Sequence, residues 1–115
     1  MENTEIFNEA DLLDTFMEDA EKAKSLLSQF IERTSGQLQE LPGLAESKNW
    51  QDAHRITHTI KGAARMLAGL ELGDAAEKLE KGYKMAELTK IEAAYPALVK
   101  AFEQYKEATA VFLSR

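Results

Sequence analysis

Two histidines, a lysine and an arginine recur at helical spacing within the segment 53–67, which reads AHRITHTIKGAARML. His54 and His58 are four residues apart, Lys61 follows His58 by three, and Arg65 follows Lys61 by four. At about 100° of rotation per residue, all four side chains fall on one face of a helix. A neutral imidazole nitrogen is a nucleophile that needs no general base, and the ordinary histidine pKa of about 6.5 keeps the ring largely neutral near pH 7. The strip therefore presents a nucleophile beside two cations.

The opposite face of this segment is apolar. Apolar residues recur there in steps of three and four, which predicts a helix with one stripe against a core: Ala53, Ile56, Ile60, Ala63 and Leu67. Gly62 lies on the polar face, although a glycine inside a helix costs about 1 kcal/mol relative to alanine. Close helix packing is one reason for such a glycine, but its place opposite the apolar stripe disfavours that reason. We interpret Gly62 as bare backbone that a partner approaches closely.

Two histidines at spacing i, i+4 can also hold a metal ion on the face of a helix. The glutamate of an H-E-x-x-H motif is missing, because Arg55 follows His54, and the residue three before His54 is Gln51 rather than the Glu of di-iron bundles. The sequence has no cysteine and no third histidine. We therefore expect no metal and no cofactor, and we expect His54 to lie beside the site and shape a partner interface.

Composition limits the classes of partner. With 115 residues, of which 44% are hydrophobic, the chain is expected to form one domain over residues 1–115 with a buried core. The net charge of −6 argues against nucleic acid or an anionic membrane as a partner. No apolar stretch reaches the roughly 18 residues of a membrane span, and the acidic start M-E-N-T-E is unlike a secretory signal. We expect a cytoplasmic monomer without membrane insertion.

The hydrophobic periodicity predicts helices throughout. After a loose start over residues 1–6, a short helix capped by Asn8 is expected to run to about residue 16. Long helices are expected over about 19–41, 50–67, 71–81 and 90–113. Asn49 is expected to cap the second long helix, Pro42-Gly43 to break or kink the first, and a Thr89-x-x-Glu92 capping box to start the last, which Pro96 should kink. The expected fold is all-α, an antiparallel four-helix bundle with a short additional N-terminal helix.

Two motifs carry a family resemblance. The segment H-T-I-K-G at 58–62 and the pattern L-x-x-A-A-x-x-L-E at 72–80 together resemble the histidine-containing phosphotransfer (HPt) domain of multistep phosphorelays. In that family the histidine accepts a phosphoryl group from a receiver-domain aspartate and hands it to another receiver, and the fold is a four-helix bundle. The family usually has glycine ten residues after the histidine, where this chain has Ala68 followed by Gly69. This departure leaves the turn between the two helices open.

The resemblance also implies roles for particular residues. His58 would be phosphorylated, Lys61 would place its ammonium near the phosphoryl oxygens with Arg65 more distant, and Glu80 would hydrogen-bond the histidine from the neighbouring helix. A plain solvated carboxylate is the alternative for Glu80. The partner would be the receiver domain of a response regulator or of a hybrid histidine kinase. It would dock over the strip around His58, with Phe7 and Leu13 as candidates for an apolar part of the interface unless these two side chains pack on the bundle.

The absence of other motifs narrows the chemistry. The chain shows no glycine-rich phosphate loop, no kinase signature and no acidic Mg²⁺ cluster. We therefore expect a phosphoryl carrier rather than an enzyme, with the catalytic groups supplied by the receiver. Two alternatives stay open: a helical interaction module without phosphotransfer, and the phosphorylated domain of a chemotaxis-type histidine kinase.

Overall fold

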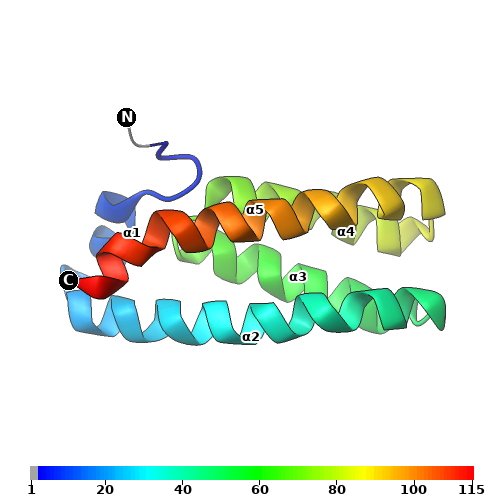
Figure 1. The fold of residues 1–115 in the computed structure, drawn as a ribbon, viewed down its shortest axis with the longest axis horizontal. Coiled ribbons are helices and arrows are strands. Elements are labelled where there is room, and N and C mark those ends of the chain that lie inside the picture. The colour runs from blue at the N-terminus through cyan, green and yellow to red at the C-terminus, as the bar shows by residue number, and fades with distance from the viewer. Residues whose placement is uncertain (1–2) are drawn as a thin grey trace.

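The computed structural model describes residues 3–115, and its secondary structure consists of helices without strands in that range. The helices are α1 (Glu9–Thr15), α2 (Ala20–Glu46), α3 (Trp50–Met66), α4 (Leu70–Met85) and α5 (Leu88–Ser114). Helices α2 to α5 run up and down in alternation, and the short α1 lies at one end of the bundle (Figure 1). The predicted all-α fold, an antiparallel four-helix bundle with a short extra N-terminal helix, is confirmed.

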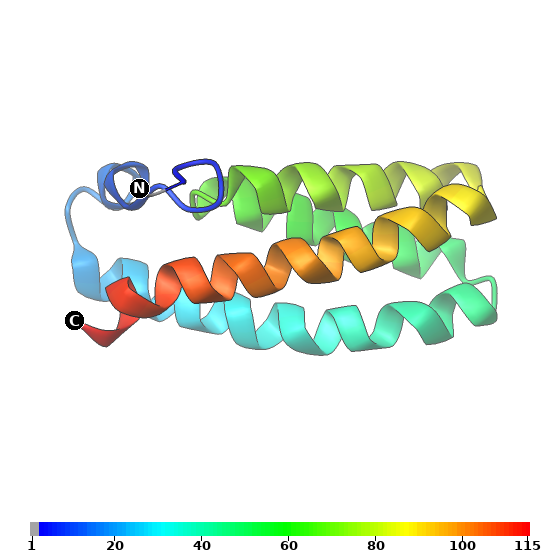
Figure 2. The same ribbon diagram turned by 45° about the horizontal axis from the view of Figure 1, so that its top comes forward.

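The core lies between the four long helices, each of which buries one stripe of side chains. The turned view shows α3 and α4 side by side and α5 next to α2 (Figure 2). In α3 the buried stripe consists of Ala53, Ile56, Thr57, Ile60 and Ala64. Because that stripe faces inward, the opposite face of α3 is turned toward solvent.

Short polar caps define where several helices begin. The side chain of Asn8 accepts a hydrogen bond from the Asp11 amide, and that of Asn49 accepts one from the Asp52 amide, as predicted. The predicted capping box of α5 is wrong: Glu87 is the N-cap, no side chain caps the helix, and Thr89 lies inside it. The start moves because α4 continues to Met85 and leaves only two residues for the turn.

Helix α2 does not end at Pro42 but continues to Glu46. Proline has no N–H, so the carbonyl four residues earlier, that of Leu38, loses its helical donor. The hydroxyl of Tyr95 in α5 donates a hydrogen bond of 2.8 Å to this carbonyl. A side chain of a neighbouring helix thus replaces the missing bond, which the spacing of residues in α2 alone could not indicate. Helix α5 likewise continues through Pro96.

The turn between α3 and α4 is fixed from three sides. Ala68 adopts a left-handed conformation with φ of 61°, and the hydroxyl of Tyr105 donates a 2.8 Å hydrogen bond to the carbonyl of Leu67. The amide of Asn8 donates to the Ala68 carbonyl, and the amide of Glu71 donates to the Glu5 carbonyl. The predicted loose start is therefore wrong for residues 3–6, which are tied to this turn, whereas residues 1–2 lie outside the described residues.

Candidate functional site

His58 lies near the middle of α3 on the face opposite the buried stripe, and its side chain is 64% exposed. One turn further on, Gly62 has no heavy atom within 4 Å of the place where a Cβ would stand, so the backbone there is open. An exposed imidazole beside uncovered backbone is accessible to a large partner.

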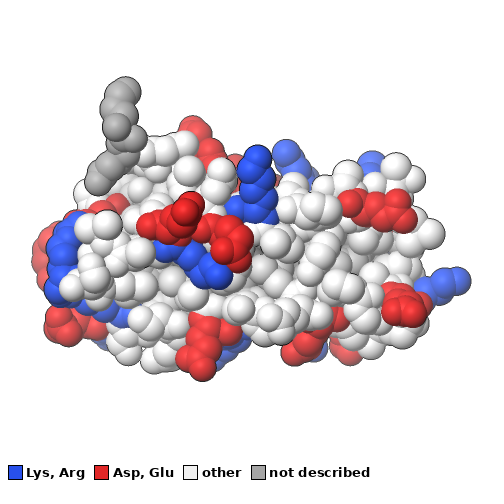
Figure 3. Space-filling model, in the orientation of Figure 1, with Lys and Arg blue, Asp and Glu red and all other residues white. Residues whose placement is uncertain are grey.

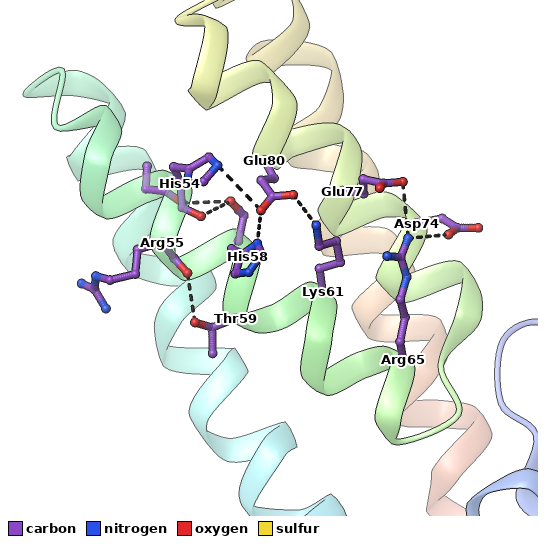
Figure 4. Close-up of polar contacts among 11 residues, drawn as sticks. His54, Arg55, His58, Thr59, Lys61, Arg65, Asp74, Glu77 and Glu80 are labelled. Carbon is purple, nitrogen blue, oxygen red and sulfur yellow. Dashed lines mark hydrogen bonds and ion pairs between the residues drawn. The ribbon is translucent and has the colours of Figure 1, made fainter.

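Glu80 reaches this strip from α4, and although its residue is only 6% exposed, both of its carboxylate oxygens are engaged. Its Oε2 lies 2.5 Å from Nδ1 of His58, and its Oε1 accepts a 2.7 Å hydrogen bond from Nζ of Lys61. Figure 4 shows the carboxylate between these two side chains of α3. The structure thus brings together three of the residues singled out in the sequence, from two helices that pack side by side.

The electrostatics of this cluster favour an ionised Glu80. Burial by itself raises the pKa of a carboxyl group, because it removes water from the charged form. The hydrogen bonds from Lys61 and His58 and their positive charges act in the opposite direction, and together they hold the pKa of Glu80 below its ordinary value of 4.5. A carboxylate at neutral pH can only accept hydrogen bonds, so Nδ1 of His58 is the donor in this contact. The other ring nitrogen, Nε2, then carries the lone pair in the neutral ring.

His54 also turns toward Glu80. Its Nε2 lies 3.7 Å from Oε2 of Glu80, and its ring lies nearly parallel to that of His58, with centroids 6.1 Å apart. The His54 side chain is 37% exposed, so it borders the site and lines part of its rim. Among residues 3–115, no group of three or more histidine, aspartate, glutamate or cysteine side chains is arranged to hold a metal ion.

Arg65 does not join the cluster around His58. Its Nη2 lies 3.2 Å from Asp74 and 3.3 Å from Glu77, both on α4 (Figure 4). Its aliphatic stem passes so close to Gly73 that a Cβ there would stand 2.8 Å from Cγ of Arg65. The two acidic partners were not singled out from the sequence, because helical periodicity does not reveal which residues of two different helices face each other.

Phe7 and Leu13 both pack on the bundle. Phe7 is 8% exposed and packs edge-on against Tyr105 and at a tilt against Phe112. Leu13 is half-buried against the hydrophobic core. The ring of Phe7 is therefore enclosed at the end of the bundle, and we assign it to the core rather than to an exposed docking surface.

On the other side of His58 the surface is hollowed by a groove that the sequence did not predict. It lies between α2 and α3 and has a volume of about 130 Å³. We call it the α2–α3 groove; its apolar lining consists of Leu26, Phe30, Ile60, Ala63, Met66 and Leu67. Thr59, the residue after His58, lines it from α3, and Arg33 lines it from α2. The spacing of apolar residues predicts the buried stripe of each helix separately, but it does not predict the groove between the two helices.

The overall surface carries charges of both signs. On the face seen in Figure 3, acidic and basic side chains lie side by side, although the chain as a whole has a net charge of −6. No helix among residues 3–115 combines the length and the apolar character that crossing a membrane requires.

A comparison with protein families matches residues 11–108 to the Hpt domain. Searches among curated proteins and among solved structures gave no match. The match begins within α1, covers α2 to α4 and most of α5, and contains His58, Lys61 and Glu80. Hpt domains are phosphocarrier modules that interact with receiver domains in phosphorelays. Because this match covers most of the chain and includes the exposed histidine, the chain belongs to the Hpt domain family of histidine phosphotransfer modules.

Proposed function

We propose that His58 accepts a phosphoryl group from the aspartyl phosphate of one receiver domain and passes it to the aspartate of another. The observation that carries this proposal is the contact between Nδ1 of His58 and the buried carboxylate of Glu80. It holds the ring in one tautomer while 64% of the side chain remains exposed. A nucleophile held in this way is ready for a donor that arrives from solution.

The chemical step balances without a further co-reactant. The Nε2 lone pair of His58 attacks the phosphorus, the P–O bond of the aspartyl phosphate breaks, and the receiver aspartate leaves as a carboxylate. The imidazole keeps its Nδ1 proton and becomes positively charged, and Glu80 faces that charge. Negative charge spreads over the equatorial oxygens of the transferring group, so cations on the partner assist there. The reverse sequence of bond changes delivers the phosphoryl group to the next receiver.

Lys61 supports the same step through Glu80. Its ammonium lies 2.7 Å from Oε1 of Glu80, and its side chain is only 18% exposed. A cation at this place keeps a buried carboxylate ionised, which in turn keeps Nδ1 of His58 protonated. We therefore assign Lys61 mainly to the ion pair with Glu80 and only secondarily to contact with the phosphoryl oxygens. Arg65 is assigned to the α3–α4 contact through Asp74 and Glu77.

The experiment that tests this function is transfer from phosphorylated receiver domains to the wild type, His58→Gln and His54→Gln. We expect acid-labile label on the wild type and on His54→Gln, and none on His58→Gln. Labelling with phosphoramidate, a small phosphoryl donor, shows whether His58 is reactive in the absence of a receiver. Label that persists in His58→Gln would show that another residue is phosphorylated. A wild type that is labelled by phosphoramidate but by no receiver would contradict the relay function.

A further inference from the structure

His54 is a titratable side chain of the site that the phosphoryl transfer step does not use. It precedes His58 by four residues, one turn of α3. Its Nε2 lies 3.7 Å from Oε2 of Glu80, the same oxygen that Nδ1 of His58 contacts. In Figure 4 both contacts are drawn to this one carboxylate, whose other oxygen, Oε1, accepts from Lys61. One carboxylate oxygen therefore faces two imidazole rings.

The charged groups around His54 come from α4 and from α3 itself. On α4, Glu80 lies within 4 Å of the His54 ring, and Lys84 follows it by one turn and is exposed. On α3, the next residue, Arg55, pairs with Asp52 at 3.6 Å. Within the part of the chain that the structure describes, no charged side chain of α2 forms an ion pair with either histidine. Glu80 is therefore the group that draws a proton to His54.

A proton that binds this pair of rings has two different places to go. On His58 it binds Nε2, which faces away from Glu80, and the ring loses its nucleophilic lone pair. On His54 it makes the ring a charged donor beside Oε2, which has a second lone pair for a charge-assisted hydrogen bond. The two rings are nearly parallel with centroids 6.1 Å apart, so positive charges on both would repel each other. The carboxylate therefore holds one imidazolium more readily than two, and His54 gains the better contact.

We propose that His54 is a positioning residue that takes up the proton drawn by Glu80 at mildly acidic pH and thereby keeps Nε2 of His58 free to attack phosphorus. This inference rests on the proposed function, because it concerns the nucleophile of that transfer. Since the pKa of Glu80 lies below the ordinary value of 4.5, its carboxylate stays charged over the range of about pH 5 to 8 in which histidines titrate. Without His54 that charge acts on the His58 ring alone, which then takes up the proton and stops reacting. The bonds made and broken at phosphorus are unchanged, and the proton on His54 stays there.

The test compares the wild type with His54→Gln, which cannot take up the proton, and His54→Lys, which carries a permanent charge. Protonation of the His58 ring is followed by NMR, and its reactivity by phosphoramidate labelling, from about pH 5 to about pH 8. We expect both midpoints to lie about half to one pH unit higher in His54→Gln than in the wild type, and at or below the wild-type value in His54→Lys. The difference should shrink at about 1 M salt, and wild type and His54→Gln should be labelled equally fast at about pH 8.

Arg55→Gln is the matched control, because it removes a permanent positive charge from the residue next to His54. Its side chain is 67% exposed and paired with Asp52, so both midpoints should stay close to those of the wild type. Equal midpoints in the wild type, His54→Gln and His54→Lys, or an equally large shift in Arg55→Gln, would overturn the inference. Neither measurement involves a receiver, so that result would leave the proposed function standing. A wild type that no receiver phosphorylates would overturn the proposed function, and the NMR midpoints would still decide whether His54 keeps the His58 ring neutral.

Discussion

Oε2 of Glu80 lies 2.5 Å from Nδ1 of His58, so a buried carboxylate on α4 determines which nitrogen of an exposed ring on α3 is free to react. The two residues are 22 positions apart in the sequence. They meet because α3 and α4 pack along their length and the turn between them is tied down by Tyr105 and by the N-terminal segment.

Replacing Glu80 should slow transfer in a graded way. Glu80→Gln keeps an acceptor for Nδ1–H but loses the charge that faces the imidazolium, whereas Glu80→Ala loses both. Because a hydrogen bond to a charged group contributes about 1.5–3 kcal/mol, we expect Glu80→Ala to transfer about 10- to 100-fold more slowly, with Glu80→Gln in between. Long-range ¹⁵N correlation spectra of the His58 ring should show the Nδ1–H tautomer depleted in Glu80→Ala. Glu77→Gln, on the same helix, is the control. Transfer rates that are equal in Glu80→Ala, Glu80→Gln and Glu77→Gln would contradict the role of Glu80.

The same carboxylate should make the fold sensitive to acid. The pKa of Glu80 in the folded chain lies below the ordinary value of 4.5, so folding favours the carboxylate form. This stabilisation is fully present above about pH 4.5 and is lost as the pH falls through the lowered folded pKa. Urea unfolding should therefore show that the free-energy advantage of the wild type over Glu80→Gln shrinks between pH 6 and pH 3.

The comparison with Glu80→Gln and one further control variant separate this effect from general acid denaturation. Glu9, whose pKa is lowered by the hydrogen bond from Arg115, contributes equally to both proteins and cancels in the difference. Glu92→Gln removes an exposed carboxylate of α5 that has no ion pair in the described range. A wild-type advantage over Glu80→Gln that is constant with pH would show that the carboxylate is not held in its charged form by the fold.

The sequence was sufficient for features that depend on one helix at a time. The caps at Asn8 and Asn49 and the shared face of His58 and Lys61 follow from spacing and residue type, and so does most of the stripe of α3. Within that stripe the prediction was wrong at one position, because Ala64 is buried and the predicted Ala63 is only half-buried. That Glu80 lies beside His58 was predicted only from the family resemblance. The periodicity of a helix does not determine how far that helix is shifted along its neighbour.

Features that depend on two elements were missed for the same physical reason. The continuation of α2 past Pro42 relies on the hydroxyl of Tyr95 from α5. The pairing of Arg65 with Asp74 and the presence of the α2–α3 groove depend on how neighbouring helices pack. The start of α5 was misplaced because the turn after Met85 is shorter than the Thr89 pattern suggested.

Two neighbouring substitutions in the α3–α4 turn, Ala68→Gly and Gly69→Ala, should change the stability of the fold in opposite directions. Ala68 has φ of 61°, a conformation that costs an L-residue about 1–2 kcal/mol and glycine almost nothing. We expect Ala68→Gly to stabilise the fold by about 0.5–1 kcal/mol, after the greater freedom of glycine in the unfolded chain is deducted. In Gly69→Ala the new Cβ would stand 2.6 Å from the Tyr105 ring, and we expect a loss of about 1–3 kcal/mol. Thermal and urea unfolding measure both, and a destabilised Ala68→Gly would contradict the assignment of strain.

Phe7→Ala should reduce stability without changing how receivers bind. The ring is buried against Tyr105 and Phe112, so its removal should cost about 3–5 kcal/mol in the free energy of unfolding. Under conditions in which the variant remains folded, KM for a receiver should equal that of the wild type, because the ring is enclosed at the end of the bundle. Leu13→Ala provides a milder comparison at the same end. A raised KM for folded Phe7→Ala would show that this residue contacts the receiver.

Gly62 should show stability and function changing in opposite directions. No atom lies within 4 Å of a Cβ at this position, so Gly62→Ala fits without a clash and should stabilise α3 by about 1 kcal/mol through helix propensity alone. If a receiver approaches the bare backbone, the added methyl group should nevertheless raise KM, and Gly62→Leu should raise it further. Phosphoramidate reaches His58 without covering Gly62, so its labelling rate should stay at the wild-type level in both variants. Unchanged KM values in the two stabilised variants would mean that the open backbone serves no partner, since propensity alone would then favour alanine at this site.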